Sequence, residues 1–294
     1  MSTSPAAPGA PELVAESAAL VSLPDVYVRL RTTIDTPGSS MDAVANVIRH
    51  DPAVTARVLQ LTNSAFFGRA SRVDTVERAV RVLGTRQLHD IVLATVTAEA
   101  FRGIDPSLVN MDLFWVNSVY CALICHALGS RCRLGTTEQL FVDGLLHDVG
   151  HLLMYQRLPE ECQAALMQAD SRHVPVYRVE RELLGFDYAQ VGGMLMESWR
   201  LPPALVEAVR HHPEARLAPA HRVEAAIVHV GSRIAHTGWP FDSAASPEEF
   251  ALDEDALALT GLTPESVEIA ALEAAQEVDE VVTALFGGDV QVTH

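Results

Sequence analysis

The chain has 294 residues, of which 49% are hydrophobic and 20% charged, a composition typical of a globular protein with a sizeable core. Its net charge is −17 and all 21 basic residues are arginine, which argues against general binding to the phosphate backbone of nucleic acids. A membrane span needs about 20 apolar residues in a row, and no apolar run in this chain approaches that length. The N-terminus also lacks the basic and apolar regions of a secretory signal, so we expect a cytoplasmic protein without membrane contact.

The first predicted elements lie before residue 103. Residues 1–19 are rich in Ala, Pro and Ser and predict a flexible tail. Asp51-Pro52 predicts a helix start, because the carboxylate can cap free amides while proline takes the first helical position. Further along, Val76, Val80 and Leu83 share one helical face, and Gly84 suits the left-handed position that ends such a helix.

Asp105-Pro106 separates this first block from a second one. Its helical patterns cover residues 113–128, 138–155, 159–169, 174–184, 188–199, 204–211 and 222–236. Residues 237–247 contain Gly, Pro and Ser and predict a linker, and two short acidic helices follow at 253–259 and 264–285. We therefore expect an all-α helical bundle with an N-terminal lobe over 20–103, a second lobe over 104–236, and a C-terminal segment over 237–294 that packs on the domain.

Charge is distributed unevenly along the chain. Residues 241–294 contain thirteen Asp and Glu and no Arg, whereas residues 69–86 contain five Arg against Asp74 and Glu77. An arginine excess of this size is common on a solvated helix face. These two segments are nevertheless the surfaces at which we first expect contact with a partner.

The four cysteines form no C-x-x-C pair and do not read as a disulfide framework. Cys121 and Cys125 are four residues apart and share one face of a predicted helix. We interpret them as small buried apolar residues rather than a metal or redox pair, because no local partner completes such a site.

The sharpest local feature is Gly144-Leu145-Leu146-His147-Asp148-Val149-Gly150-His151. The His147 nitrogen and the Asp148 oxygen are both good ligands for zinc, iron or manganese. Adjacent residues point about 100° apart on a regular helix, so the two converge on one ion only where the helix ends or is distorted, which Gly150 permits.

The segment Leu145-Leu146-His147-Asp148-Val149-Gly150 resembles the signature of the HD superfamily of metal-dependent phosphohydrolases, and residues 20–236 resemble its HDOD branch. Other matching segments occur in order along the chain: Leu23-Pro24, Asp51-Pro52, Asn63-Ser64-Ala65-Phe66-Phe67-Gly68, the apolar helix ending at Gly84, Trp115 before Ser118, Val191-Gly192, Trp199-Arg200-Leu201-Pro202 and His211-His212. The resemblance implies an all-α bundle and a role in bacterial signalling through protein partners.

The departures from the HD pattern bear on catalysis. The resemblance places an earlier metal ligand at Asn117, whose neutral amide is a poor ligand for a transition metal, and Tyr188 stands where HDOD relatives often have histidine. The candidate metal ligands that remain are His147, Asp148, His211 and His212, and we expect them to be vestigial. A catalytic metal site generally needs three protein ligands and an open position. We therefore expect no catalytic residues and no bound cofactor, with Fe, Mn or Zn present only if the site is functional.

Two other interpretations of these residues compete. His147 and His151 imitate the H-E-x-x-H zinc helix of metalloproteases, but Asp148 is shorter than glutamate and Gly150 weakens the helix between them. The second concerns His211-His212, which closes a predicted helix before proline; the helix dipole gives a structural reason for it that we prefer to a remnant ligand pair. Trp115 and Trp199 are interpreted as core residues.

The sequence thus predicts a non-catalytic regulatory module that acts through unidentified signalling proteins, with its oligomeric state open. The alternative is an HD-type metal-dependent phosphohydrolase or cyclic-nucleotide phosphodiesterase that uses His147, Asp148 and His211 or His212. There is no phosphate loop, nucleophile elbow or dinucleotide fingerprint to suggest another enzyme.

Overall fold

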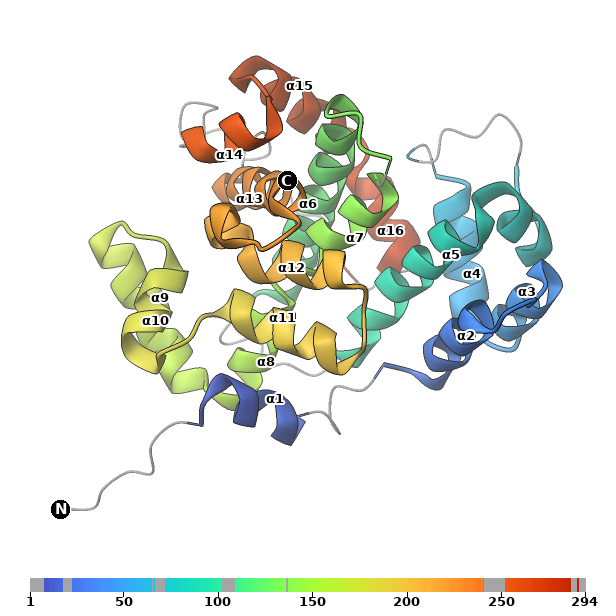
Figure 1. Cartoon of the computed structure of the whole chain (residues 1–294), viewed down its shortest axis with the longest axis horizontal. Helices are drawn as coiled ribbons and strands as arrows, with labels where there is room; N and C mark the ends of the chain where they lie inside the picture. The colour runs from blue at the N-terminus through green and yellow to red at the C-terminus, as the bar shows by residue number, and fades with distance from the viewer. Residues whose placement is uncertain are drawn as a thin grey trace.

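The computed structural model describes residues 8–17, 23–64, 66, 72–101, 109–135, 137–238, 240, 252–286 and 290. Every regular element in these ranges is a helix, which confirms the predicted all-α class. Figure 1 shows an N-terminal lobe on one side and a larger second lobe on the other, with the C-terminal helices at the top and between the two lobes.

The N-terminal lobe contains α2 (Asp25–Asp35), α3 (Met41–Arg49), α4 (Pro52–Thr62) and α5 (Val76–Ala100). The predicted start of α4 is confirmed, because the Asp51 carboxylate accepts hydrogen bonds from the backbone N–H groups of Ala53 and Val54, each at 3.0 Å. Gly84 interrupts α5 with a φ of 79°, a left-handed conformation that suits glycine. The predicted helix end is therefore a kink between two helical stretches.

The second lobe holds the functional site. Its helices are α6 (Met111–Arg131), α7 (Thr137–Leu146), α8 (Val149–Arg157), α9 (Pro159–Arg172), α10 (Val176–Leu184), α11 (Tyr188–Ser198), α12 (Pro203–His211), the 3₁₀ helix η2 (His212–Leu217) and α13 (Arg222–Thr237). The single helix predicted over 138–155 is wrong, since the chain breaks between α7 and α8. Trp115 and Trp199 are buried as predicted.

The central helix of this lobe is α6. Contrary to the expectation from the sequence, α6 is long and apolar enough to cross a membrane by length and composition, but 67% of the relevant window is buried inside the protein. Its contacts with α7, α13 and α15 are those of a core helix. Cys121 and Cys125 are fully buried on it, as predicted, with their sulfur atoms 3.9 Å apart.

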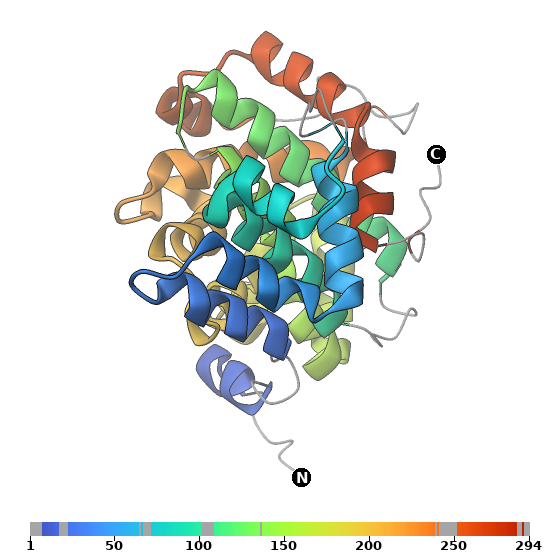
Figure 2. The same ribbon diagram turned by 90° about the vertical axis from the view of Figure 1, so that its right-hand side faces the viewer.

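The acidic C-terminal segment forms α14 (Glu254–Thr260), α15 (Pro264–Ala275) and α16 (Val278–Phe286), so the second predicted helix is divided in two. These helices pack on both lobes: α15 lies against α6, where the Tyr120 hydroxyl donates to Ala271 O at 3.1 Å, and α16 runs beside α4 (Figure 2). Most of the predicted linker, residues 239 and 241–247, lies outside the described part.

The expectation of a flexible tail over 1–19 is wrong for part of that range. Residues Ala10–Ser17 form α1, which packs on α8 and α11. Leu13 is fully buried, and Glu16 forms an ion pair with Arg157 at 2.9 Å. Three apolar positions, Ala10, Leu13 and Val14, recur at helical spacing and give this short segment a buried face.

A buried carboxyl group lies between the lobes, one turn before the end of α7. The Asp143 side chain is fully buried, and neither of its oxygens has a hydrogen-bond partner in the described residues. Burial raises the pKa of Asp143 well above its usual 3.8, and the carboxylates of Asp90 and Glu224 raise this pKa further, while the Gln139 side chain lowers it in part. Asp143 is therefore protonated in the folded protein over a range where it ionises in the unfolded chain.

This pKa shift predicts a pH-dependent gain from Asp143→Asn. A carboxyl group with a raised folded-state pKa favours folding below its unfolded pKa of 3.8 and loses that contribution as the pH rises towards the folded value. Asparagine has nearly the same shape and does not ionise. We expect the melting temperature of Asp143→Asn to exceed that of the wild type by more at pH 8 than at pH 5, measured by circular dichroism. An identical difference at both pH values would contradict the assignment.

A candidate metal centre beside a histidine cluster

The candidate site forms where α7 ends and α8 begins. Asp148 is the residue before α8 and has φ −98° and ψ 6°, outside regular helical geometry. Gly150 permits α11 to approach closely, because a Cβ at this position would lie 1.9 Å from Tyr188 O and 2.6 Å from Gly192 N. The predicted distortion at the His-Asp pair is therefore confirmed, and it turns His147 and Asp148 towards each other.

His147 and Asp148 are buried with two polar atoms left without partners. His147 Nδ1 lies 2.7 Å from Gly144 O and donates its proton there, so Nε2 is the nitrogen that faces Asp148 Oδ2, at 3.3 Å. His147 Nε2 and Asp148 Oδ1 have no hydrogen-bond partner among the described residues. Two buried polar atoms without hydrogen-bond partners could be satisfied by a cation or a water molecule between them.

His236, in the last turn of α13, completes a group of three. Its Nδ1 donates to Ser232 O at 2.7 Å and its Nε2 lies 3.1 Å from Asp148 Oδ2. The donor atoms of His147, Asp148 and His236 all lie within 4.8 Å of one another. This third donor was missed in the sequence, where His236 is simply the end of a predicted helix with no motif around it.

Without a metal, opposite charges hold His236 and Asp148 together. Burial lowers the pKa of His236, but the Asp148 carboxylate outweighs it, so the pKa is raised overall. Burial raises the pKa of Asp148, but His147 and His236 outweigh it and hold this pKa well below its usual range. The ring of His236 is 49% exposed, so solvent screens part of this attraction.

The two adjacent histidines at the end of α12 have different environments. His212 is buried and close to His147, with a ring-centroid distance of 5.4 Å. His211 is half-buried instead and interacts with Arg210 and Glu207, which places it outside the cluster. The structure therefore does not bring His211 into the group of donors, while His212 lies beside it.

The Tyr188 hydroxyl is hydrogen-bonded to the His212 nitrogen that would otherwise bind a metal. His212 Nδ1 donates to Val209 O at 2.7 Å, so Nε2 is the acceptor, and the Tyr188 hydroxyl lies 2.9 Å from it. Burial lowers the pKa of His212 well below its usual value, and the nearby His147 adds to this effect, so the ring is neutral. The residue that departs from the family pattern thus satisfies the lone pair of a candidate ligand.

His151 supplies a positive charge on the other side of Asp148. Its ring stacks between those of Tyr188, at 3.8 Å, and Tyr155, at 5.3 Å. Its Nε2 lies 3.0 Å from Glu180 Oε1 and its Nδ1 3.6 Å from Asp148 Oδ1. Burial lowers the pKa of His151, but Glu180 and Asp148 outweigh it and raise the pKa to about 10.

This arrangement rules out the zinc-helix interpretation. His147 lies in the break between α7 and α8, and His151 lies on α8 and faces Glu180. The two rings therefore do not share one helical face, which the metalloprotease geometry requires.

Helix α6 comes close to the cluster at Cys121. Burial raises the pKa of Cys121, as do its neighbour Cys125 and the charge of Asp148. Asn117 is one turn before Cys121, on the same face of α6. Asn117, where the family resemblance places a metal ligand, thus shares the helical face of Cys121.

An iron, manganese or zinc ion would be held by His147, Asp148 and His236. The two partnerless buried atoms and the fixed Nδ1–H donors of both histidines fit such an ion. Three protein ligands are the minimum of a catalytic site, at which a metal acts as a Lewis acid and activates bound water. Because His212 is hydrogen-bonded to Tyr188, the number of protein ligands available to an ion is three, which meets this minimum and does not exceed it.

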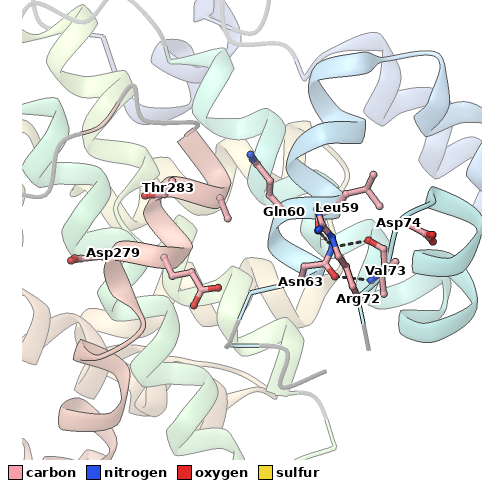
Figure 3. A pocket seen from close by; sticks show the side chains of 10 residues that line it. Leu59, Gln60, Asn63, Arg72, Val73, Asp74, Asp279 and Thr283 are labelled. Atoms are coloured by element: carbon pink, nitrogen blue, oxygen red, sulfur yellow. Dashed lines mark hydrogen bonds between the residues drawn. The ribbon is translucent and has the colours of Figure 1, made fainter. Parts of the chain in front are cut away.

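The cluster lies at the base of a cavity of about 480 Å³, lined among others by His151, Tyr188, His212 and His236. A larger cavity of about 1140 Å³ lies elsewhere, between α4 and α16 (Figure 3). Its lining includes Asn63, whose side-chain amide forms two hydrogen bonds with the backbone of Val73, each at 2.7 Å. No described histidine or cysteine lines this larger cavity. The chemistry of the chain is therefore concentrated in the smaller cavity.

Comparison with known proteins places these features in context. The sequence profile of the HDOD domain matches residues 20–215. A protein from Shewanella amazonensis, provisionally named a phosphohydrolase, has a similar structure, with a TM-score of 0.74 and 26% identity over 93% of this chain and 98% of that one. An HDOD domain protein of unknown function from Geobacter sulfurreducens has a TM-score of 0.71 and 20% identity, over 96% and 98% of the two chains.

Two further relatives are longer than this chain. A provisionally named signal transduction protein from Marinobacter aquaeolei has a TM-score of 0.67 and 23% identity, over 92% of this chain and 60% of that one. An uncharacterised protein from Treponema pallidum is 23% identical over 198 residues, which is 67% of this chain and 38% of that protein. The chain thus spans less than two thirds of the length of each.

Proposed function

This chain belongs to the HDOD family, and from that premise we propose that it is a non-catalytic regulatory module of bacterial signal transduction that acts through protein partners. The observation that carries the proposal is the Tyr188 hydroxyl on His212 Nε2, at 2.9 Å. It removes one histidine from any metal cage, while Asn117 supplies only a neutral amide on α6. What remains is the minimum ligand set of a catalytic site.

Charge balance in the cluster supports the same proposal. Asp148 and Glu180 are the carboxylates of the cluster, and His151 and His236 are the imidazoles paired with them. With both imidazoles protonated, these two pairs are neutral without a metal, and His147 faces Asp148 as well. A divalent ion would have to displace the proton from His236, whose Nε2 would become a ligand. The metal-free cluster therefore needs no further cation to stabilise Asp148.

A metal-dependent phosphohydrolase or cyclic-nucleotide phosphodiesterase is the second candidate. The specific observation in its favour is the group of three donors formed by His147, Asp148 and His236, with two partnerless atoms. It replaces the set expected from the sequence, in which His211 or His212 was the third ligand.

Turnover separates the two candidates. We expect the purified protein, supplied with Fe²⁺, Mn²⁺ or Zn²⁺, to hydrolyse neither p-nitrophenyl phosphate nor bis-p-nitrophenyl phosphate above the rate of its His147→Ala variant. His147→Ala removes one donor of the group and keeps Asp148 and His236. Hydrolysis that requires His147 would establish the enzyme and end the regulatory proposal.

The partner surfaces expected from the sequence remain predictions. The large groove in Figure 3 has Arg72 and Asp74 on one wall and the start of α16, with Asp279, on the other. It thus joins parts of both segments. Under the regulatory proposal, Asp148→Ala should leave the affinity for a signalling partner unchanged so long as the variant stays folded, because the partner contacts the surface and not the cluster.

A further inference from the structure

The cavity above the cluster has an arginine on each of two helices. Arg178 is contributed by α10 and Arg233 by α13, and both line the cavity. Neither forms an ion pair with a carboxylate of the described residues. Arg178 Nε donates to the Tyr177 hydroxyl at 3.2 Å, so this guanidinium group is held against the cavity wall. The Glu214 carboxylate acts on Arg178 from a distance but forms its ion pair with Arg181. Two guanidinium groups without an ion pair are an unusual local feature in a chain of net charge −17.

The carboxylates near this cavity are engaged elsewhere. Asp253 lines the mouth, and its side chain accepts a hydrogen bond from Asp255 N at 2.8 Å as the cap of α14. In the depth of the site, Asp148 and Glu180 are paired with His236 and His151. Asp253 is not paired with either arginine, so guanidinium N–H groups of both remain available to a ligand. Guanidinium groups bind planar or tetrahedral anions with two parallel hydrogen bonds.

The rest of the lining suits an organic molecule. Pro175, Val176 and Pro213 provide an apolar wall, and Tyr177 and Tyr188 add aromatic side chains. His229 Nδ1 donates to His212 O at 2.9 Å, which makes its Nε2 an acceptor for a ligand hydroxyl or N–H group. A volume of about 480 Å³ lies within the ordinary range of small-molecule pockets.

We propose that this cavity binds a small organic anion as an effector, with Arg233 and Arg178 holding the anionic group and the apolar wall holding the remainder. The inference rests on the proposed regulatory function, because the anion is bound and released unchanged. It supplies the input that a regulatory module requires. The shared chemistry is a phosphate or carboxylate group on a planar organic body.

The test is binding to the full chain at constant ionic strength, measured by isothermal titration calorimetry and by the melting temperature. The probes are adenosine monophosphate, phthalate and inorganic phosphate alone. We expect one of the two organic anions to bind and to raise the melting temperature. Arg233→Ala should weaken this binding about tenfold or more, as expected when a charged hydrogen bond is lost.

The controls separate the site from general charge effects. Arg29→Ala removes the same charge from an exposed position of α2, outside the cavity, and should leave the affinity unchanged. Arg233→Lys keeps the charge but loses the paired hydrogen bonds, so we expect an intermediate affinity. Circular dichroism of each variant without ligand verifies that it is folded.

Each outcome bears on one claim. Binding of adenosine monophosphate but not phthalate identifies a phosphate ligand, and the reverse identifies a carboxylate. Absence of binding by either organic anion, or binding that Arg233→Ala leaves intact, overturns the effector site while the regulatory proposal stands. Recovery of adenosine from the phosphate probe would instead overturn the regulatory proposal, because the ligand would have been hydrolysed.

Discussion

Glu180→Ala is expected to lower the free energy of unfolding by about 3–5 kcal/mol, the cost of leaving a buried charge without its partner. The partner is His151, whose side chain is 7% exposed and whose pKa is raised to about 10 by Glu180 and Asp148 against the effect of burial. Glu180 Oε2 also accepts the backbone N–H of Tyr188 at 3.0 Å, so the change leaves a second buried donor unsatisfied. Urea unfolding followed by circular dichroism measures the loss.

Two further variants define the cause of this loss. Glu182→Ala removes a carboxylate from the same helix, but its partner Arg172 and Glu182 itself are both exposed, so we expect little change. His151→Phe combined with Glu180→Leu replaces the buried ion pair by apolar groups and keeps an aromatic ring between Tyr155 and Tyr188. This double variant should recover part of the stability that Glu180→Ala loses. Equal, small effects of Glu180→Ala and Glu182→Ala would contradict a buried charged pair.

Gly150→Ala is expected to lower the free energy of unfolding by about 3 kcal/mol or more, because the added methyl group would clash with backbone atoms that cannot move without separating two helices. The added Cβ would meet three backbone atoms, Tyr188 O at 1.9 Å, Gly192 N at 2.6 Å and Tyr188 C at 2.9 Å. Helices α8 and α11 would have to separate, which would also move Tyr188 away from His212. Thermal and urea unfolding measure this loss.

Two other glycines provide a graded comparison for Gly150→Ala. At Gly192 the nearest atom to an added Cβ is Gly150 N, at 3.3 Å, so a mild loss is expected. At Gly135 no atom lies within 4 Å, and alanine should be tolerated. The order of destabilisation is therefore Gly150, then Gly192, then Gly135. Any other order would mean that the crossing of α8 and α11 is not tightly packed.

Local sequence rules predicted those parts of the fold that depend on neighbouring residues. The carboxylate of Asp51 and the ring of Pro52 define the start of α4 by chemistry within one turn. The distortion at His147-Asp148 was predictable because Gly150 follows it. The tail prediction failed at Leu13 because the partners that bury α1 lie on α8 and α11, far along the chain.

The site was less predictable for the same physical reason. His211 and His212 are neighbours, yet the transition from α12 to η2 turns only His212 into the cluster. His236 has no local motif, and only the packing of α13 beside α7 brings its ring to Asp148. The pairing of His151 with Glu180 likewise depends on α9 and α11, which contact both α8 and α10. These contacts join residues distant in sequence, which periodicity and spacing do not report.

The metal content of the purified full chain tests the central claim most directly, because the regulatory proposal requires that the group of three donors does not retain a reactive ion. The protein should be produced in medium supplemented with iron, manganese and zinc, passed through a desalting column, and analysed by inductively coupled plasma mass spectrometry beside its His147→Ala variant. We predict metal far below one ion per chain in both. One tightly held ion per wild-type chain, lost in His147→Ala, would contradict the account.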